Sequence, residues 1–248
     1  MLNSNGVLRG RTAAVLGLAG AVLSGVGDAL ILGRSCSGRE FDDATGRIPP
    51  NIDADPRWRS LWNGASFAPG RLQVGTVIGV VGIGVLQAAG LRAAARSVPP
   101  GRLRRLATVS VAGFALSGVL THLGCGTVIA AYRRSAERAA DAPDRRHSSP
   151  RSATTMLAVS ALGALGTLAV FSGAVIGAAV RDPGPTPMGR AVATPFPCVL
   201  ATLLTFGALP APIGGYVRPA SMSIGLAVSF AASSVSSPGI TVSSSRPV

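Results

Sequence analysis

The 248-residue sequence has no lysine, three cysteines and few aromatic residues. All 23 basic residues are arginine, and with the many glycines and prolines this indicates GC-rich bacterial coding. Cys36, Cys125 and Cys198 form no Cys-x-x-Cys pair and show no regular spacing, which argues against a disulfide framework and a zinc site. We therefore expect no metal and no cofactor. Cys125 and Cys198 lie in apolar runs and are expected to be small buried residues.

A net charge of +13 is common in proteins that bind nucleic acid. Such proteins combine basic clusters with aromatic side chains, whereas the basic linker 96–105 contains no aromatic residue. The arginines instead flank apolar runs, where they anchor a membrane protein and set its topology. We expect membrane lipids as partners and no nucleic acid. The oligomeric state stays open.

The apolar residues gather into runs of about twenty, the length that crosses the hydrocarbon core of a bilayer as a helix. The sequence predicts an all-α, polytopic transmembrane helix bundle of about six spans: 12–33, 72–95, 106–132, 154–180, 195–217 and 220–236. We expect one integral-membrane domain, 1–236, a disordered tail, 237–248, and a location in the bacterial plasma membrane. The first run is too long for a cleaved signal peptide. Whether the last two segments both span stays open, because Pro210 and Pro212 interrupt one and the other is short.

The connections between the runs carry almost all the charge. Within the first long loop, the sequence predicts a short helix at Asp55–Gly64 with Trp58 and Trp62 on one face. This pattern is typical of a helix that lies in the headgroup region of a membrane. A lid over a substrate is the alternative. The third span is expected to continue as a helix to about Ala142. The acid-free linker 96–105 favours a cytoplasmic N-terminus, although the arginine-rich stretch 133–151 then lies outside and keeps the other orientation open.

Small residues at helical spacing predict close contacts between the spans. Gly75-x-x-x-Gly79 lies in the second span and Gly173-x-x-x-Gly177 in the fourth. Glycines four residues apart lie on one face of a helix and let another backbone approach. We interpret both as packing seams, and not as phosphate-binding loops, because Gly-x-Gly-x-x-Gly is absent.

Asp28 is the only acidic residue within a long apolar run. A carboxylate at the centre of a membrane helix costs roughly 2.5–3.5 kcal/mol on insertion scales, so it needs a partner or water. Because successive spans alternate in direction, Asp28, Arg71 and His122 fall in the same half of the bundle. The sequence therefore allows a polar pocket lined by these three residues, with Ser24 and Cys125 as further candidates.

Each of these residues also has a purely structural interpretation. Asp28 could pair with Arg34 or Arg71, His122 could fix helix packing, and Arg71 could anchor the end of its span. Ser117 and Thr121 lie near His122, but hydroxyls on a helix normally bond to the preceding turn, so no Ser-His-Asp arrangement is specified.

Four segments together resemble a known family. They are Gly27-Asp28-Ala-Leu-Ile-Leu, the Trp/Arg loop, Arg71-Leu72-Gln-Val-Gly75 and His122. They resemble an uncharacterised family of bacterial multi-pass membrane proteins with Gly-Asp near the end of the first span, over residues 12–180. The resemblance implies a bacterial inner-membrane bundle and no established activity. It makes Asp28, Arg71 and His122 the positions to test.

Three functions are compatible with these features. The first is a membrane protein whose polar pocket binds or moves a small molecule or a proton. The second is an intramembrane enzyme acting on a lipid or isoprenoid, with Asp28 and His122 as catalytic candidates and Arg71 as a substrate-binding candidate. The third is a structural or accessory bundle in which these residues only fix helix register.

Overall fold

The computed structural model describes residues 4–33, 69–141, 151–181, 193–207, 209, 217 and 219–235. Within these ranges every regular element is a helix and none is a strand. The elements are α1 (Ser4–Leu32), α5 (Pro69–Val81), the π-helix η1 (Gly82–Gln87), α6 (Ala88–Ser97), α7 (Arg102–Asp141), α8 (Arg151–Arg181), α10 (Pro195–Gly207) and α12 (Ser221–Val235). The predicted all-α bundle is confirmed.

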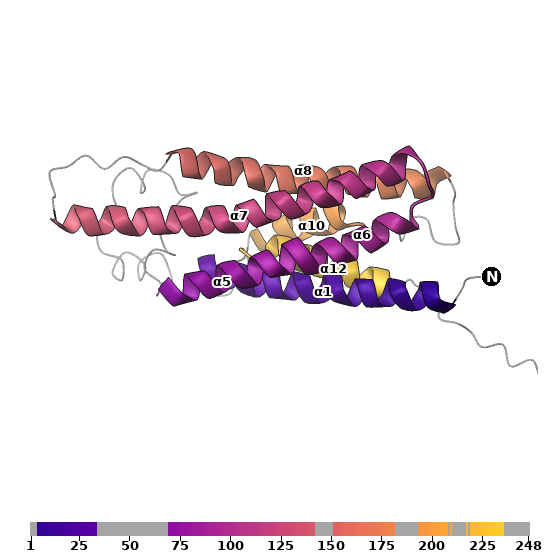
Figure 1. The fold of residues 1–248 in the computed structure, drawn as a ribbon, viewed down its shortest axis with the longest axis horizontal. Helices are drawn as coiled ribbons and strands as arrows, with labels where there is room; N and C mark the ends of the chain where they lie inside the picture. Colours follow the sequence, from indigo (N-terminus) through magenta and orange to yellow (C-terminus); the bar gives the residue numbers. More distant parts are fainter. Residues whose placement is uncertain are drawn as a thin grey trace, which may run out of the picture.

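Four segments of the bundle are long and apolar enough to cross a bilayer. They are Arg11–Leu32, Gly70–Ser97, Arg102–Ala130 and Thr155–Arg181, and they coincide with the first four predicted spans. The second consists of α5, η1 and α6, which follow one another without interruption. Helix α7 continues beyond its span to Asp141, as expected, and projects past its neighbours in Figure 1.

The outer surface of these helices is apolar. Val77 is 61 % exposed, Val109 70 %, Leu162 68 % and Leu204 71 %. A water-soluble protein rarely leaves contiguous apolar surface of this kind uncovered, whereas lipid chains solvate it at no cost. Helix length and surface together are those of an all-α helical bundle of membrane type.

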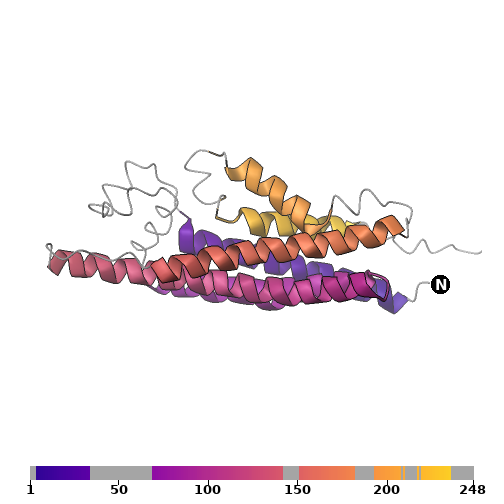
Figure 2. The same cartoon turned by 90° about the horizontal axis from the view of Figure 1, so that it is seen from above.

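The helices follow one another around a closed ring in chain order. Helix α1 packs against the α5–η1–α6 rod on one side and against α12 on the other (Figure 1). Helix α7 packs against both that rod and α8, and α10 packs against both α8 and α12. In Figure 2 α10 forms the upper edge of the bundle, next to α12. A buried cluster that includes Ile83, Phe114, Leu168 and Phe230 draws side chains from every part of the ring.

Glycines set the distance between α1 and α5. A methyl group added at Gly27 would lie 2.7 Å from the Gly75 carbonyl oxygen and 2.9 Å from the Gly79 nitrogen. One added at Gly75 would lie 2.9 Å from Leu30 and Ile31. The predicted Gly75-x-x-x-Gly79 seam is confirmed, because the two backbones approach more closely than any side chain permits.

The second predicted seam is wrong. Among the described residues, a methyl group at Gly173 would have no atom within 4 Å, and one at Gly177 would meet only the side chain of Leu103, at 3.7 Å. Helix α8 packs on α7 through other positions, since Gly163 lies against Ser117 and Gly113 against Thr167. Spacing places two glycines on one face but does not say which face meets a neighbour.

The last two helices are short. Helix α10 has 13 residues and α12 has 15; at 1.5 Å per residue they reach about 20 and 23 Å, less than the ~30 Å of a bilayer core. The Ser172 hydroxyl accepts the Phe196 N–H at 2.9 Å, and Ser229 donates to the Ala193 carbonyl at 2.7 Å. Ser172 lies about 13 Å of helix from Arg181, so these hydroxyls satisfy backbone groups in and just before the first turn of α10, deep within the bundle, as a membrane requires.

Several sequence predictions concern residues outside the described ranges. They are the interfacial helix Asp55–Gly64, the Pro210–Gly215 break, Cys36 and the tail 237–248. The single-domain prediction for 1–236 also includes such residues and stays a prediction.

Candidate functional site

Asp28 lies within the bundle, on the last turn but one of α1. Four residues separate it from Leu32, about 6 Å of helix. Its side chain is 17 % exposed. The small residues around it, Gly25 and Gly27, allow α12 and α5 to approach α1 on either side of the carboxylate. The acid is therefore enclosed by helices and does not face lipid, the arrangement expected of an ionisable residue in a membrane.

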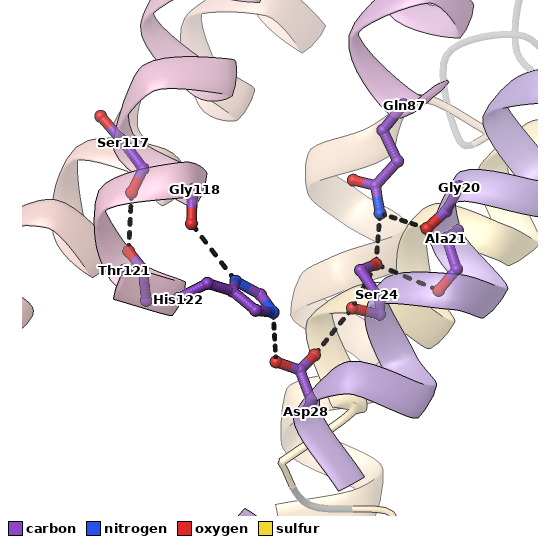
Figure 3. Close-up of polar contacts among 10 residues, drawn as sticks. Gly20, Ala21, Ser24, Asp28, Gln87, Ser117, Gly118, Thr121 and His122 are labelled. Atoms are coloured by element: carbon purple, nitrogen blue, oxygen red, sulfur yellow. Dashed lines mark hydrogen bonds and ion pairs between the residues drawn. The ribbon is translucent and has the colours of Figure 1, made fainter. Parts of the chain in front are cut away.

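His122 approaches Asp28 from α7. Its side chain is 5 % exposed, and its Nε2 lies 3.1 Å from Asp28 Oδ1 (Figure 3). The imidazole lies directly over Gly79 of α5, where an added methyl group would collide with Cδ2 and Nε2. The absence of a side chain at Gly79 is what allows the ring to reach α1. The structure thus brings together the two residues that the sequence predicted as catalytic candidates.

The second ring nitrogen fixes the imidazole. His122 Nδ1 lies 3.3 Å from the carbonyl oxygen of Gly118, one turn earlier in α7. A backbone carbonyl only accepts hydrogen bonds, so Nδ1 carries the proton. Nε2 is then left facing the carboxylate, and it has no other partner among the described residues.

A chain of hydrogen bonds extends from Asp28 towards the middle of the bundle. Ser223 of α12 donates to Asp28 Oδ2 at 2.9 Å, and Ser24 of α1 donates to Ser223 at 3.0 Å. Gln87 Nε2, at the end of η1, donates to Ser24 and, at 3.2 Å, to the Gly20 carbonyl (Figure 3). The chain joins α1, η1 and α12, and through His122 also α7.

The donors in this chain have a defined direction. Gln87 must turn its amide nitrogen towards the Gly20 carbonyl, so Gln87 donates to Ser24 and not the reverse. Ser24 can then donate to Ser223, which donates to Asp28. The Ser24 hydroxyl also has the Ala21 carbonyl as an acceptor at 3.1 Å, whereas the Ser223 hydroxyl donates directly to the Asp28 carboxylate and stabilises it. The Gln87 Oε1, fully buried, has no partner in the part of the chain that the structure describes.

Arg71 occupies the same end of the bundle but caps a helix. Its Nε donates to the Leu30 carbonyl at 2.8 Å, and its Nη2 donates to Ala29 at 3.2 Å and Gly33 at 2.9 Å. These carbonyls belong to the C-terminal turn of α1, where cations are favourable. The contacts identify Arg71 as a cap for α1, and its role in substrate binding stays a prediction.

The other candidates lie close by. Ser24 is part of the hydrogen-bonded chain, as the sequence allowed, and Cys125 is buried one turn after His122. Thr121 donates to the Ser117 carbonyl at 2.8 Å, which confirms the expected bond to the preceding turn, and contacts the Ser160 hydroxyl of α8 at 3.2 Å. Among the residues searched in the described ranges, no three His, Cys, Asp or Glu side chains gather as metal ligands would.

Sequence reasoning missed Ser223 and Gln87. Gln87 could have been found, because it is an amide within an otherwise apolar stretch of the second span. Ser223 could not, because the α12 segment carries several serines and nothing in the sequence distinguishes the one that reaches Asp28.

The fold and the site define a multi-pass membrane helical bundle with an acid–imidazole pair buried between its helices. Residues 2–238 match a family of unknown function, DUF6796, and the chain belongs to it. The match confirms the uncharacterised family expected from the sequence and extends it through the C-terminal third, which the resemblance did not cover. No curated protein and no solved structure matched the chain.

Proposed function

We propose that this protein binds and releases a proton at the Asp28–His122 pair, as an integral protein of the bacterial plasma membrane. The 3.1 Å contact between a carboxylate and an imidazole inside membrane-spanning helices carries the proposal. Ionisable residues in such a position mark proton relays and substrate pathways. The arginine-only basic composition supports the bacterial location.

The hydrogen bonds around the pair determine how many protons it exchanges. His122 Nδ1 keeps its proton because it faces the Gly118 carbonyl, and Asp28 Oδ2 is an acceptor because Ser223 donates to it. One proton is then shared between His122 Nε2 and Asp28 Oδ1. With this proton the pair is neutral, and without it the pair carries one negative charge.

The Asp28–His122 pair is accessible to protons from one end of the bundle. Asp28 is partly exposed and lies about 6 Å of helix from the end of α1, whereas the chain through Ser223 and Ser24 ends inside the bundle at Gln87. An amide does not pass on a proton as a hydroxyl does. We therefore expect uptake and release at the end of the bundle where α1 finishes and α5 begins.

The test is proton exchange by the purified protein. In lipid nanodiscs, infrared titration should show a protonated-carboxyl C=O band that varies with pH and disappears in Asp28→Asn. In His122→Gln the band should titrate over a different pH range, because the shared proton then has no imidazole partner. Thr205→Val is a matched control, because Thr205 is exposed on α10 and donates only within its own helix.

The outcomes separate the proposal from its alternatives. A carboxyl band unaffected by Asp28→Asn, or a band that titrates identically in wild type and His122→Gln, would overturn the proposal. Folded variants with normal exchange but an altered lipid composition of the cells would favour the intramembrane enzyme instead.

A further inference from the structure

Seven arginines whose side chains the structure describes lie at the end of the bundle opposite the Asp28–His122 pair. They come from α1, α6, α7 and α8, and they are Arg11, Arg92, Arg96, Arg102, Arg104, Arg105 and Arg181. All are exposed except Arg104, which is half-buried. The described residues at this end include no aspartate or glutamate, so among them the positive charge of this arginine end has no counter-charge.

A tight turn brings together the two segments that contain most of these arginines, α6 and the start of α7. Gly101, at φ +140°, takes a backbone conformation that other residues rarely adopt, and its carbonyl accepts the Arg105 N–H at 3.2 Å. The Arg104 side chain then reaches back to the Arg96 carbonyl at the end of α6. The turn thus holds the cations of α6 beside those at the start of α7.

This arrangement is unfavourable for the isolated protein. Like charges repel, and cations in the first turn of a helix oppose its dipole. None of the arginines at this end forms an ion pair with a described residue. An anion bound here would relieve both effects, and the planar guanidinium matches the oxygens of a phosphate particularly well.

The surroundings identify the anion as a lipid. Arg11, Arg102 and Arg181 are the terminal residues of membrane spans, so they lie at the level of the headgroups. Directly beside them the surface turns apolar: Leu106 and Val109 lie one turn beyond Arg102 and Arg105, and Val180, 73 % exposed, adjoins Arg181. A soluble polyanion would contact only the arginines, whereas a phospholipid can contact both surfaces.

We propose that the arginine end binds anionic phospholipids. Arg102 and Arg105 hold the phosphate, and Leu106 and Val109 contact the acyl chains below it. The proposal also orients the molecule, because the arginine end then faces the leaflet richer in anionic lipid, which is the cytoplasmic one. It is independent of proton exchange at the Asp28–His122 pair.

The test measures lipid binding to the full-length protein in detergent by native mass spectrometry. Phosphatidylglycerol should bind more tightly than phosphatidylcholine with the same acyl chains, and glycerol phosphate should not compete. At about 1 kcal/mol per arginine near an anionic surface, Arg102→Gln/Arg104→Gln/Arg105→Gln should weaken phosphatidylglycerol binding roughly a hundredfold. Arg133→Gln/Arg134→Gln/Arg138→Gln removes the same charge from the other end of α7 and should keep wild-type affinity.

Three results would overturn the proposal. They are equal binding of the two lipids, an equal loss in both triple variants, and full competition by glycerol phosphate, which would indicate a site for free phosphate. If the first triple variant does not fold, Arg92→Gln/Arg181→Gln tests the same end with two exposed residues. A loss of at least tenfold is expected there.

Discussion

The absence of a side chain at Gly79 leaves the space that the His122 imidazole occupies in the candidate site. Replacing Gly79 by alanine tests this geometry directly. In the structure the His122 imidazole occupies the space that a Cβ at this position requires. Gly79→Ala must therefore displace the ring, and the backbone of α1 at Gly27 limits any movement of α5 in the other direction. The substitution should separate Nε2 from Asp28.

Gly173→Ala supplies the reference for the magnitude. No atom in the part of the chain that the structure describes lies within 4 Å of a methyl group at Gly173, so the alanine adds its better helix propensity, about 0.5–1 kcal/mol. Overpacking at a tight position costs about 1–3 kcal/mol. Gly79 also lies within a helix, so both alanines gain this propensity and it cancels in the comparison. The two variants should therefore differ by about 1–3 kcal/mol in the free energy of unfolding, with Gly79→Ala the less stable.

Reversible unfolding in mixed micelles measures this difference, and the infrared carboxyl band reports on Asp28 in the same samples. We expect the band to shift in Gly79→Ala and to stay unchanged in Gly173→Ala. Equal stability of the two variants together with an unchanged band would refute the contact between His122 and Gly79 on which the site depends.

Two further predictions concern the neighbours of Asp28. Ser223→Ala removes a hydrogen bond to a carboxylate and should lower the free energy of unfolding by about 1.5–3 kcal/mol. The control Ser234→Ala loses only a bond to the Ala231 carbonyl and should change this free energy by less than about 0.5 kcal/mol. Equal effects of the two substitutions would argue against the Ser223–Asp28 bond. Arg71→Met should cost about 2 kcal/mol and speed hydrogen exchange in the last turn of α1, and unchanged exchange relative to the exposed control Arg92→Met would contradict the capping role.

The sequence predicted the bundle because hydrophobic length is a local property. A run of about twenty apolar residues is visible without knowledge of its neighbours, and the alternation of spans then places Asp28 and His122 in the same half. The meeting of these two residues followed from topology. The location of Gly173 on an open face of α8 does not follow from topology, because it depends on how α8 is rotated about its own axis.

The hydrogen-bonded chain was less predictable than the pair at its end. Ser223 and Ser24 are 199 positions apart in the chain, and serine is common in membrane helices as a packing residue. Only the packing of α12 against α1, in which a methyl group at Gly25 would lie 3.4 Å from Ser223, selects one serine among several.

The π-helix η1 bears on how this family tolerates insertions and deletions. Gly75, Gly82 and Gly90 all face α1, although the first two are seven positions apart and the last two are eight. At about 100° per residue, seven residues of regular helix return to nearly the same face and eight overshoot it by about 80°; the wider turn of η1 absorbs the additional residue. Deleting lipid-facing Val85 should convert η1 into ordinary α-helix and keep Gln87 beside Ser24, so the shortened protein should fold with wild-type stability. The same deletion at Val77, within regular helix, should rotate the rest of the rod away from α1 and prevent accumulation of the protein.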